Sequence, residues 1–264
     1  MKMKLLLPLI GIAGVFCIHA PAAESLIVTT DGREIKASSI ELRGNGDLEY
    51  LLPNQKVKKR IARGHYRYAR VPKPASITAA DQKFREQQWK TAAALYRKGG
   101  TEYRLLGWYA YCVRMEAESM IRSGEKDQAA KLLQGLHNER DLDPEQARER
   151  ALGDNLLADL LIERKQFAEA EAILAVQCRM DDPELAFAAS FKKAVILQGQ
   201  GKRKEAALQF YRTALLFPGN PRRAEALFNS WSLLSEQKSP DAAKIADMLK
   251  RDYPDSVYTK QVSF

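Results

Sequence analysis

Between residues 25 and 72, apolar residues occur in short segments that are interrupted by Gly, Asn, Asp and Pro. Segments such as 25–30 (SLIVTT) and 48–52 (LEYLL) are rich in the β-branched and apolar residues that favour strands. Turn-forming residues separate these segments, beginning with Asp31-Gly32. This pattern predicts about five short strands, arranged as a small antiparallel barrel or sheet.

The composition changes near residue 75. Prolines in the segment 71–76 (VPKPAS) push the residues before them out of the helical region, so this segment is expected to be a linker. After the first 23 residues, we therefore divide the chain into a β module (24–72), a linker (73–78) and a helical domain (79–264).

From Ala80 onward, residues that favour helices predominate, and one feature repeats. Five segments carry an alanine at the same place, with spacings of 37, 41, 36 and 36 residues: Ala92, Ala129, Ala170, Ala206 and Ala242. A second set of small residues precedes the last four of them: Ala117, Ala158, Ala194 and Ser230. Small side chains at fixed places allow two helices to pack closely. The repeat predicts about five stacked helical hairpins.

Four dipeptides mark expected helix starts, because each places a capping side chain before a proline at the first helical position. They are Asp143-Pro144, Asp182-Pro183, Asn220-Pro221 and Ser239-Pro240. Within the fourth hairpin, we expect Gly201 in the tight turn and Pro218 at the end of the second helix.

Residues 78–258 resemble the tetratricopeptide repeat family, whose unit is a helix–turn–helix of about 34 residues. In 201–221 (GKRKEAALQFYRTALLFPGNP), Ala206 is followed by Phe210 and Pro218, as in the second helix of that repeat. The first module resembles the SH3-like β modules that begin some bacterial envelope proteins, through its opening VTTDGREIK. Together the resemblances imply an α+β protein of two domains: a small antiparallel β-barrel or sheet, followed by an all-α helical solenoid of the envelope tetratricopeptide type.

In that family, the first helices of the hairpins line a concave surface that binds a protein or peptide. Carried over residue by residue, the resemblance implies a groove formed by Tyr111, Arg114, Glu118, Asn155, Asp159, Phe191, Gln198 and Trp231. Exposed aromatic and charged groups would suit such a ligand. Tyr111, Phe191 and Trp231 could equally serve in ordinary packing between hairpins.

The first 23 residues have the pattern of a secretory signal peptide. Two lysines precede an apolar run at residues 5–18, and the small residues Ala20 and Ala22 precede the expected cleavage site. A lipid anchor at Cys17 is the alternative, although a bulky residue precedes that cysteine. We therefore expect an exported protein, located in the periplasm or associated with the outer membrane of a Gram-negative-type bacterium.

The net charge of the chain is +9, and residues 24–74 hold eleven basic and six acidic residues. Cations and tyrosines of one segment form a candidate surface for an anionic partner: Lys56, Lys58, Lys59, Arg60, Arg63, Tyr66, Arg67, Tyr68 and Arg70. The expected anion is an envelope polymer or a membrane surface, because an exported protein rarely meets nucleic acid. The alternative, which we favour for these residues, is a solvated strand face whose charge discourages edge pairing.

Catalytic and metal-binding motifs are not apparent in the sequence. His65 and His137 are not spaced as metal ligands, and no nucleophile elbow, phosphate loop or zinc-protease motif occurs. We therefore expect neither an enzyme nor a cofactor nor a metal site. For Cys112 and Cys178, a disulfide and two free thiols both remain open.

The predicted function is that of an exported, non-catalytic adaptor or scaffold of the cell envelope, which binds a protein or peptide partner along its first helices. The alternative function is binding of an anionic envelope polymer or a membrane surface through the basic β module. A nucleic-acid partner is not expected.

Overall fold

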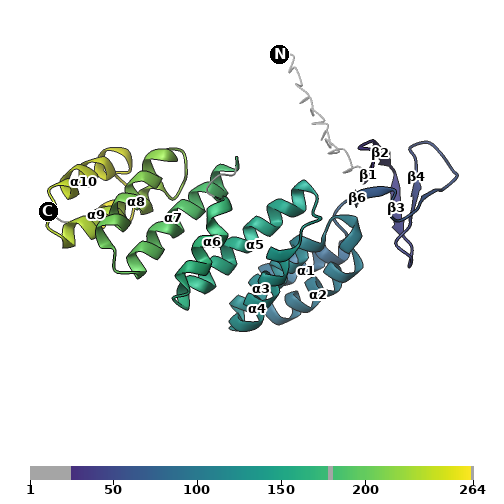
Figure 1. Cartoon of the computed structure of the whole chain (residues 1–264), viewed down its shortest axis with the longest axis horizontal. Coiled ribbons are helices and arrows are strands. Elements are labelled where there is room, and N and C mark those ends of the chain that lie inside the picture. Colours follow the sequence, from purple (N-terminus) through teal and green to yellow (C-terminus); the bar gives the residue numbers. More distant parts are fainter. Residues whose placement is uncertain (1–24, 178–180, 263–264) are drawn as a thin grey trace, which may run out of the picture.

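The computed structural model describes residues 25–177 and 181–262. The expected signal peptide, with Cys17, lies outside the described residues, and so does Cys178. Figure 1 shows the β strands at one end of an elongated row of helices. The last helix of the chain lies at the opposite end of that row.

In the described part of the chain, six strands form two three-stranded antiparallel sheets, with the orders β2-β1-β6 and β3-β4-β5. The strands are β1 (Ser25–Thr29), β2 (Glu34–Ala37), β3 (Ser39–Leu42), β4 (Leu48–Leu51), β5 (Lys59–Ile61) and β6 (Tyr66–Arg70). The segment 33–42 is divided into β2 and β3 at Ser38, whose N–H donates to the carbonyl of Leu51 at 2.7 Å. The chain passes there from one sheet to the other, which accounts for six strands instead of about five. The sheets do not close into a barrel, so only the sheet prediction is confirmed.

A single core lies between the two sheets. It combines Ile27 and Ala69 of the first sheet with Ile40, Leu48 and Tyr50 of the second. Leu106, in the short 3-10 helix η1 (Arg104–Leu106), also belongs to this core. The β module is therefore packed against the helical part of the chain as well as upon itself.

Ten α-helices follow in the described residues, and consecutive helices pack in pairs as five hairpins (Figure 1). The pairs are α1 (Ala75–Arg85) with α2 (Trp89–Glu102), α3 (Tyr109–Arg122) with α4 (Lys126–Asn138), α5 (Pro144–Glu163) with α6 (Phe167–Gln177), α7 (Pro183–Gly199) with α8 (Arg203–Leu216), and α9 (Arg223–Glu236) with α10 (Asp241–Asp252). A second 3-10 helix, η2 (Thr259–Gln261), follows α10. The prediction of five helical hairpins is confirmed.

The repeated small residues lie where the helices meet. Four of the five aligned alanines are fully buried and the fifth, Ala242, is 9% exposed. Ala117, Ala158, Ala194 and Ser230 on the first helices are also fully buried. The hydroxyl of Ser230 donates to the carbonyl of Ala207 on the neighbouring helix α8 at 2.8 Å. The alanine register therefore marks the close contacts between helices, as the pattern predicted.

Two of the four predicted helix starts are confirmed. Asp143 and Asp182 each accept two backbone N–H groups at the start of a helix with proline in its first turn. The other two were placed too early, since α9 begins at Arg223 and α10 at Asp241. Asn220 instead closes a turn before α9, because its carbonyl accepts from the N–H of Arg223 at 3.0 Å.

The turn inside each hairpin contains one residue in the left-handed backbone region. These residues are Gln87, Gly124, Lys165, Gly201 and Lys238, with φ of 59°, 90°, 60°, 78° and 53°. Gly201 occupies the turn that was predicted for it, and Pro218 follows the end of α8 as expected. In three of the turns, a residue with a side chain adopts a conformation that glycine adopts at lower cost.

Polar contacts also join the β module to the helices. The N–H of Val71 donates to the carbonyl of Leu106 at 3.3 Å, and Nε1 of Trp108 donates to the carbonyl of Val71 at 3.0 Å. Arg70 forms ion pairs with Asp143 and Glu145 at the start of α5. These contacts place the C-terminal end of β6 against the loops of the first hairpins.

Candidate functional site

A pocket of about 350 Å³ lies between α3, α5 and α7. These three helices contact one another in sequence, α3 with α5 and α5 with α7. Four predicted groove residues line the pocket: Arg114, Glu118, Asn155 and Asp159. Apolar side chains of Leu152, Leu156, Leu185 and Ala188 also line it, together with Glu184 and Lys192. We call this pocket the α3–α7 groove.

Two ion-paired cations lie in the groove. Nε of Arg114 donates to Oε2 of Glu149 at 2.6 Å, and its Nη1 lies 3.5 Å from Oε2 of Glu118. Lys192 pairs with Asp159, and its side chain is only 13% exposed. Burial lowers the pKa of the Lys192 ammonium, although the Asp159 carboxylate opposes that shift. An ammonium has three N–H donors, so the pair leaves donors for a ligand.

Asn155 brings a buried amide to the groove. Its residue is 9% exposed, and its Nδ2 donates to the carbonyl of Ala151 at 3.3 Å. Its Oδ1 is buried and accepts no hydrogen bond from the residues that the structure describes. A buried acceptor without a donor costs free energy, which a ligand N–H group could recover.

Tyr111, at the N-terminal end of α3, lies outside the groove lining and is held by the linker. Nζ of Lys73 lies 4.3 Å from the centre of the Tyr111 ring and donates to its hydroxyl at 3.0 Å. That hydroxyl donates to Asp81 at 2.7 Å, and Asp81 also pairs with Lys73. Burial and the Asp81 carboxylate raise the pKa of Tyr111. Tyr111 therefore fixes the linker against the first two hairpins.

The remaining three predicted groove residues lie on α7 and α9 and do not line the groove. Phe191 is buried, with its ring centre 5.0 Å from that of Phe210, and therefore serves in core packing. Trp231 is half-buried, with its ring centre 5.5 Å from that of Phe228. Gln198 is exposed near the end of α7. The structure thus brings together four of the eight predicted groove residues and separates the other four from them.

Lys192 was not predicted as a groove residue. It lies next to Phe191, which was predicted, and next to Lys193, which is exposed. Sequence alone gives no signal that distinguishes these two lysines, because only the rotation of α7 turns Lys192 toward Asp159.

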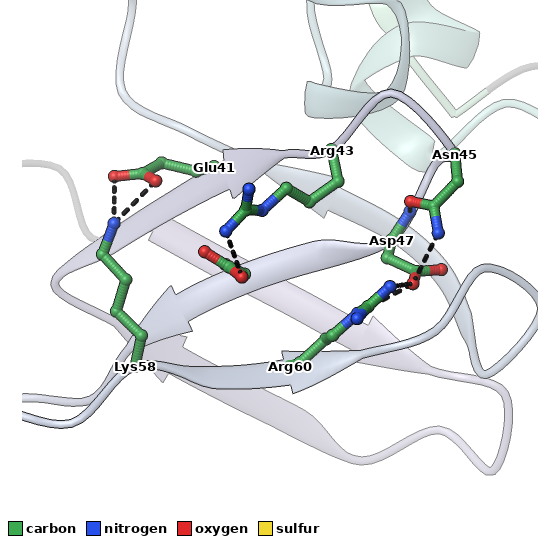
Figure 2. Close-up of polar contacts among 7 residues, drawn as sticks. Glu41, Arg43, Asn45, Asp47, Lys58 and Arg60 are labelled. Atoms are coloured by element: carbon green, nitrogen blue, oxygen red, sulfur yellow. Dashed lines mark hydrogen bonds and ion pairs between the residues drawn. The ribbon is translucent and has the colours of Figure 1, made fainter.

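Ion pairs on the β3-β4-β5 sheet neutralise part of the predicted basic patch, as Figure 2 shows. Lys58 donates to both carboxylate oxygens of Glu41 at 2.6 Å, and Nε of Arg60 donates to Oδ2 of Asp47 at 2.9 Å. Arg43 pairs with Glu49 on the same face. These cations therefore alternate with carboxylates instead of forming a uniformly basic surface.

The other residues of the predicted patch have different surroundings. Lys56 and Lys59 are exposed, and Arg70 pairs with Asp143 and Glu145. The last four residues of the predicted patch line one cleft beside the start of α5: Arg63, Tyr66, Arg67 and Tyr68.

Within residues 25–177 and 181–262, no group of three or more His, Cys, Asp or Glu side chains is placed to hold a metal ion. His65 is exposed, whereas Nδ1 of His137 lies 2.8 Å from Oδ1 of Asp154. Cys112 is a buried free thiol, and burial raises its pKa to about 12, so it stays protonated near neutral pH. None of the helices in this part of the chain is long and apolar enough to cross a membrane.

The fold is thus a β module of two small sheets followed by an array of helical hairpins. No protein-family model matches the chain, and no curated protein matches it. Among solved structures, the chain is similar to one described as "Crystal structure of YrrB: a TPR protein with an unusual peptide-binding site". The two share 17% sequence identity with a TM-score of 0.46, over 70% of this chain and 88% of that chain.

Proposed function

We propose that this protein is a non-catalytic scaffold that binds an extended segment of a partner protein in the α3–α7 groove. The observation that carries the proposal is the convergence of Arg114, Glu118, Asn155 and Asp159 on one pocket together with Lys192. The helices that supply them are the first helices of three consecutive hairpins.

The groove has the composition that a polypeptide segment requires. Leu152, Leu156 and Leu185 offer an apolar lining for side chains. The unpaired Oδ1 of Asn155 can accept a backbone N–H, and the ammonium of Lys192 can donate to a backbone carbonyl. A lining that offers both a donor and an acceptor suits the alternating groups of an extended backbone.

The location of this activity is part of the proposal. The signal-like pattern of the first 23 residues supports export, with an envelope protein as the partner. We also propose an SH3-like type for the β module, supported by the passage of the chain between its two sheets at Ser38. Binding of a broad anionic polymer is less well supported, because Lys58, Arg60 and Arg70 are already paired with carboxylates.

A displayed library of random peptides tests the proposal on the purified chain. Peptides that bind are synthesised, and their affinity is measured by fluorescence anisotropy. Asn155→Leu and Lys192→Met are each expected to weaken binding about tenfold or more, since each removes a hydrogen bond made to a buried group. Lys193→Met is the matched control, because its side chain is exposed on the same helix, and it should change affinity less than about twofold.

Circular dichroism confirms that each variant is folded. If the library yields no binding peptide, or if Asn155→Leu and Lys192→Met leave the affinity unchanged, the α3–α7 groove is not the binding site.

A further inference from the structure

We propose that a cleft between the β module and the segment before α5 binds a polyvalent oxyanion through Arg63 and Arg67. The cleft has a volume of about 670 Å³, within the range of small-ligand sites. It shares no lining residue with the α3–α7 groove, so the two proposals are independent.

The two walls of the cleft come from different parts of the chain. Arg63, Tyr66, Arg67 and Tyr68 of β6 and the turn before it form one wall. Residues 141–144, which lead into α5, form the other. Clefts at the junction of two structural units are frequent ligand sites, because each unit supplies groups that the other lacks.

Arg63 and Arg67 differ from the other arginines of the basic segment. Arg60 and Arg70 pair with carboxylates, whereas neither Arg63 nor Arg67 has a carboxylate partner among the described residues. The guanidinium of Arg63 lies 5.2 Å from the centre of the Tyr66 ring. Nε and Nη2 of Arg67 donate to the carbonyl of Thr30 at 3.2 and 3.1 Å, which fixes the guanidinium and leaves Nη1 for a ligand.

These groups match an oxyanion in chemistry. A guanidinium presents planar N–H donors in a geometry that suits carboxylate and phosphate oxygens. Tyr68 is half-buried and lines the cleft; its hydroxyl makes no hydrogen bond within the described residues and is a further donor. A cleft of this volume exceeds the needs of a single phosphate, so a larger anion with several charges is expected to bind best.

The carboxylates of the opposite wall set the charge balance. Asp143 is neutralised: it pairs with Arg70 and accepts the N–H groups of Glu145 and Gln146 at 3.0 and 3.1 Å, and Nε2 of Gln146 at 2.8 Å. Because the Asp143 carboxylate already accepts the first N–H groups of α5, these groups are not free to bind an anion. The ligand must therefore be held by Arg63 and Arg67. Asp141 is exposed and remains the uncompensated negative charge of the lining. Removal of that charge should strengthen the binding of an anion.

Isothermal titration calorimetry of the full chain tests the proposal with three probes: inorganic phosphate, pyrophosphate and citrate, each at constant ionic strength. Pyrophosphate or citrate is expected to bind more tightly than phosphate. The order of those two distinguishes a phosphate ligand from a carboxylate ligand.

Variants then locate the site. Arg63→Gln and Arg67→Gln should each weaken binding about tenfold, because a charge-assisted hydrogen bond is lost. Lys59→Gln is the matched control, since Lys59 is exposed on β5 and does not line the cleft; its effect should stay below about twofold. Asp141→Asn is expected to strengthen binding.

The proposal is overturned if none of the probes binds, or if Lys59→Gln weakens binding as much as the arginine variants do. Weaker binding by Asp141→Asn would also overturn it, because a ligand that needs this carboxylate is not a simple oxyanion. If Arg67→Gln lowers the melting temperature through loss of its contact with Thr30, Arg63→Gln gives the deciding measurement, since the Arg63 guanidinium lies by the Tyr66 ring and forms no ion pair within the described residues.

Discussion

Gly199 and Phe167 meet where the end of α7 lies against the start of α6: a Cβ built on Gly199 would lie 2.7 Å from Cζ of Phe167. Real Cβ atoms do not approach other atoms so closely, so Gly199→Ala must displace the ring. We expect overpacking to outweigh the helix propensity that the alanine gains, so the substitution should lower the free energy of unfolding by about 1 kcal/mol. Urea denaturation measures the change.

Two further variants test whether the cost comes from the contact with Phe167 or from replacing a glycine by alanine in general. Gly219→Ala is the control, because a Cβ there meets no atom within 4 Å. In a Phe167→Leu background, Gly199→Ala should cost less, since the ring is gone. An equal cost in both backgrounds would show that the ring is not the cause.

The left-handed turns inside the hairpins give a second prediction. Lys165 and Gly201 occupy equivalent turns, with φ of 60° and 78°. Because a side chain is strained in this region, Gly201→Ala should lower the free energy of unfolding by about 1 kcal/mol. Lys165→Gly relieves the strain and should raise the free energy of unfolding by up to about 1 kcal/mol. Part of this gain is offset, because glycine gives the unfolded chain more conformational entropy.

Thermal denaturation of the two variants checks this prediction. Lys131→Gly, at an exposed position within α4, is the control and should cost about 1 kcal/mol through lost helix propensity. A loss of similar size for Lys165→Gly would mean that the left-handed turn does not strain the lysine.

The hairpins could be predicted because close packing leaves a mark in sequence. Where two helices approach, only a small residue fits, so Ala92, Ala129 and Ala170 recur in register and are fully buried. The strand count and the helix starts at Asn220 and Ser239 were less well predicted. A bend such as that at Ser38 depends on which partner each half of the strand finds, and sequence does not show this.

The candidate site could be predicted only in part, for a related reason. Arg114 and Asp159 were found because they follow the repeat, and the repeat fixes which face of each helix they occupy. Lys192 was missed because the rotation of α7, which turns this side chain toward Asp159, is set by packing between helices. The contact of Lys73 with Tyr111 joins the linker to α3 across 38 residues, and no local pattern predicts such a pair.

Arg70 is expected to hold the β module against the helices. Its side chain is 22% exposed, and its partner Asp143 has a fully buried side chain. Arg70→Gln leaves that carboxylate with fewer donors, so we expect a loss of about 2–3 kcal/mol in the free energy of unfolding. Proteolysis between β6 and α1, at residues 71–74, should also become faster, because the module is then held less firmly.

Guanidinium denaturation and timed proteolysis measure these effects. Arg33→Gln is the control, because Arg33 and its partner Asp31 are mostly exposed and an exposed pair contributes less than about 1 kcal/mol. The prediction fails if Arg70→Gln is no more destabilising than Arg33→Gln.

Glu116 is expected to make the protein less stable as the pH rises, whereas most carboxyl groups of folded proteins have the opposite effect. Its side chain is 6% exposed, and burial raises its pKa above the ordinary value of 4.5, although Nε of Arg97, at 2.7 Å, partly offsets that shift. A carboxyl group with a raised pKa destabilises the folded state when it is ionised. This cost is present above the raised pKa, shrinks as the pH falls through it, and vanishes below about 4.5.

Glu116→Gln removes this ionisation while keeping an oxygen that can accept from Arg97. The variant is therefore expected to be more stable than the natural chain near pH 8, with a difference that shrinks as the pH is lowered toward 4.5. Urea denaturation at several pH values measures the difference. Glu163→Gln, which removes an exposed carboxylate paired with Lys126, should give a small difference that varies little with pH. If Glu116→Gln were less stable at high pH, the ion pair with Arg97 would outweigh the cost of burial.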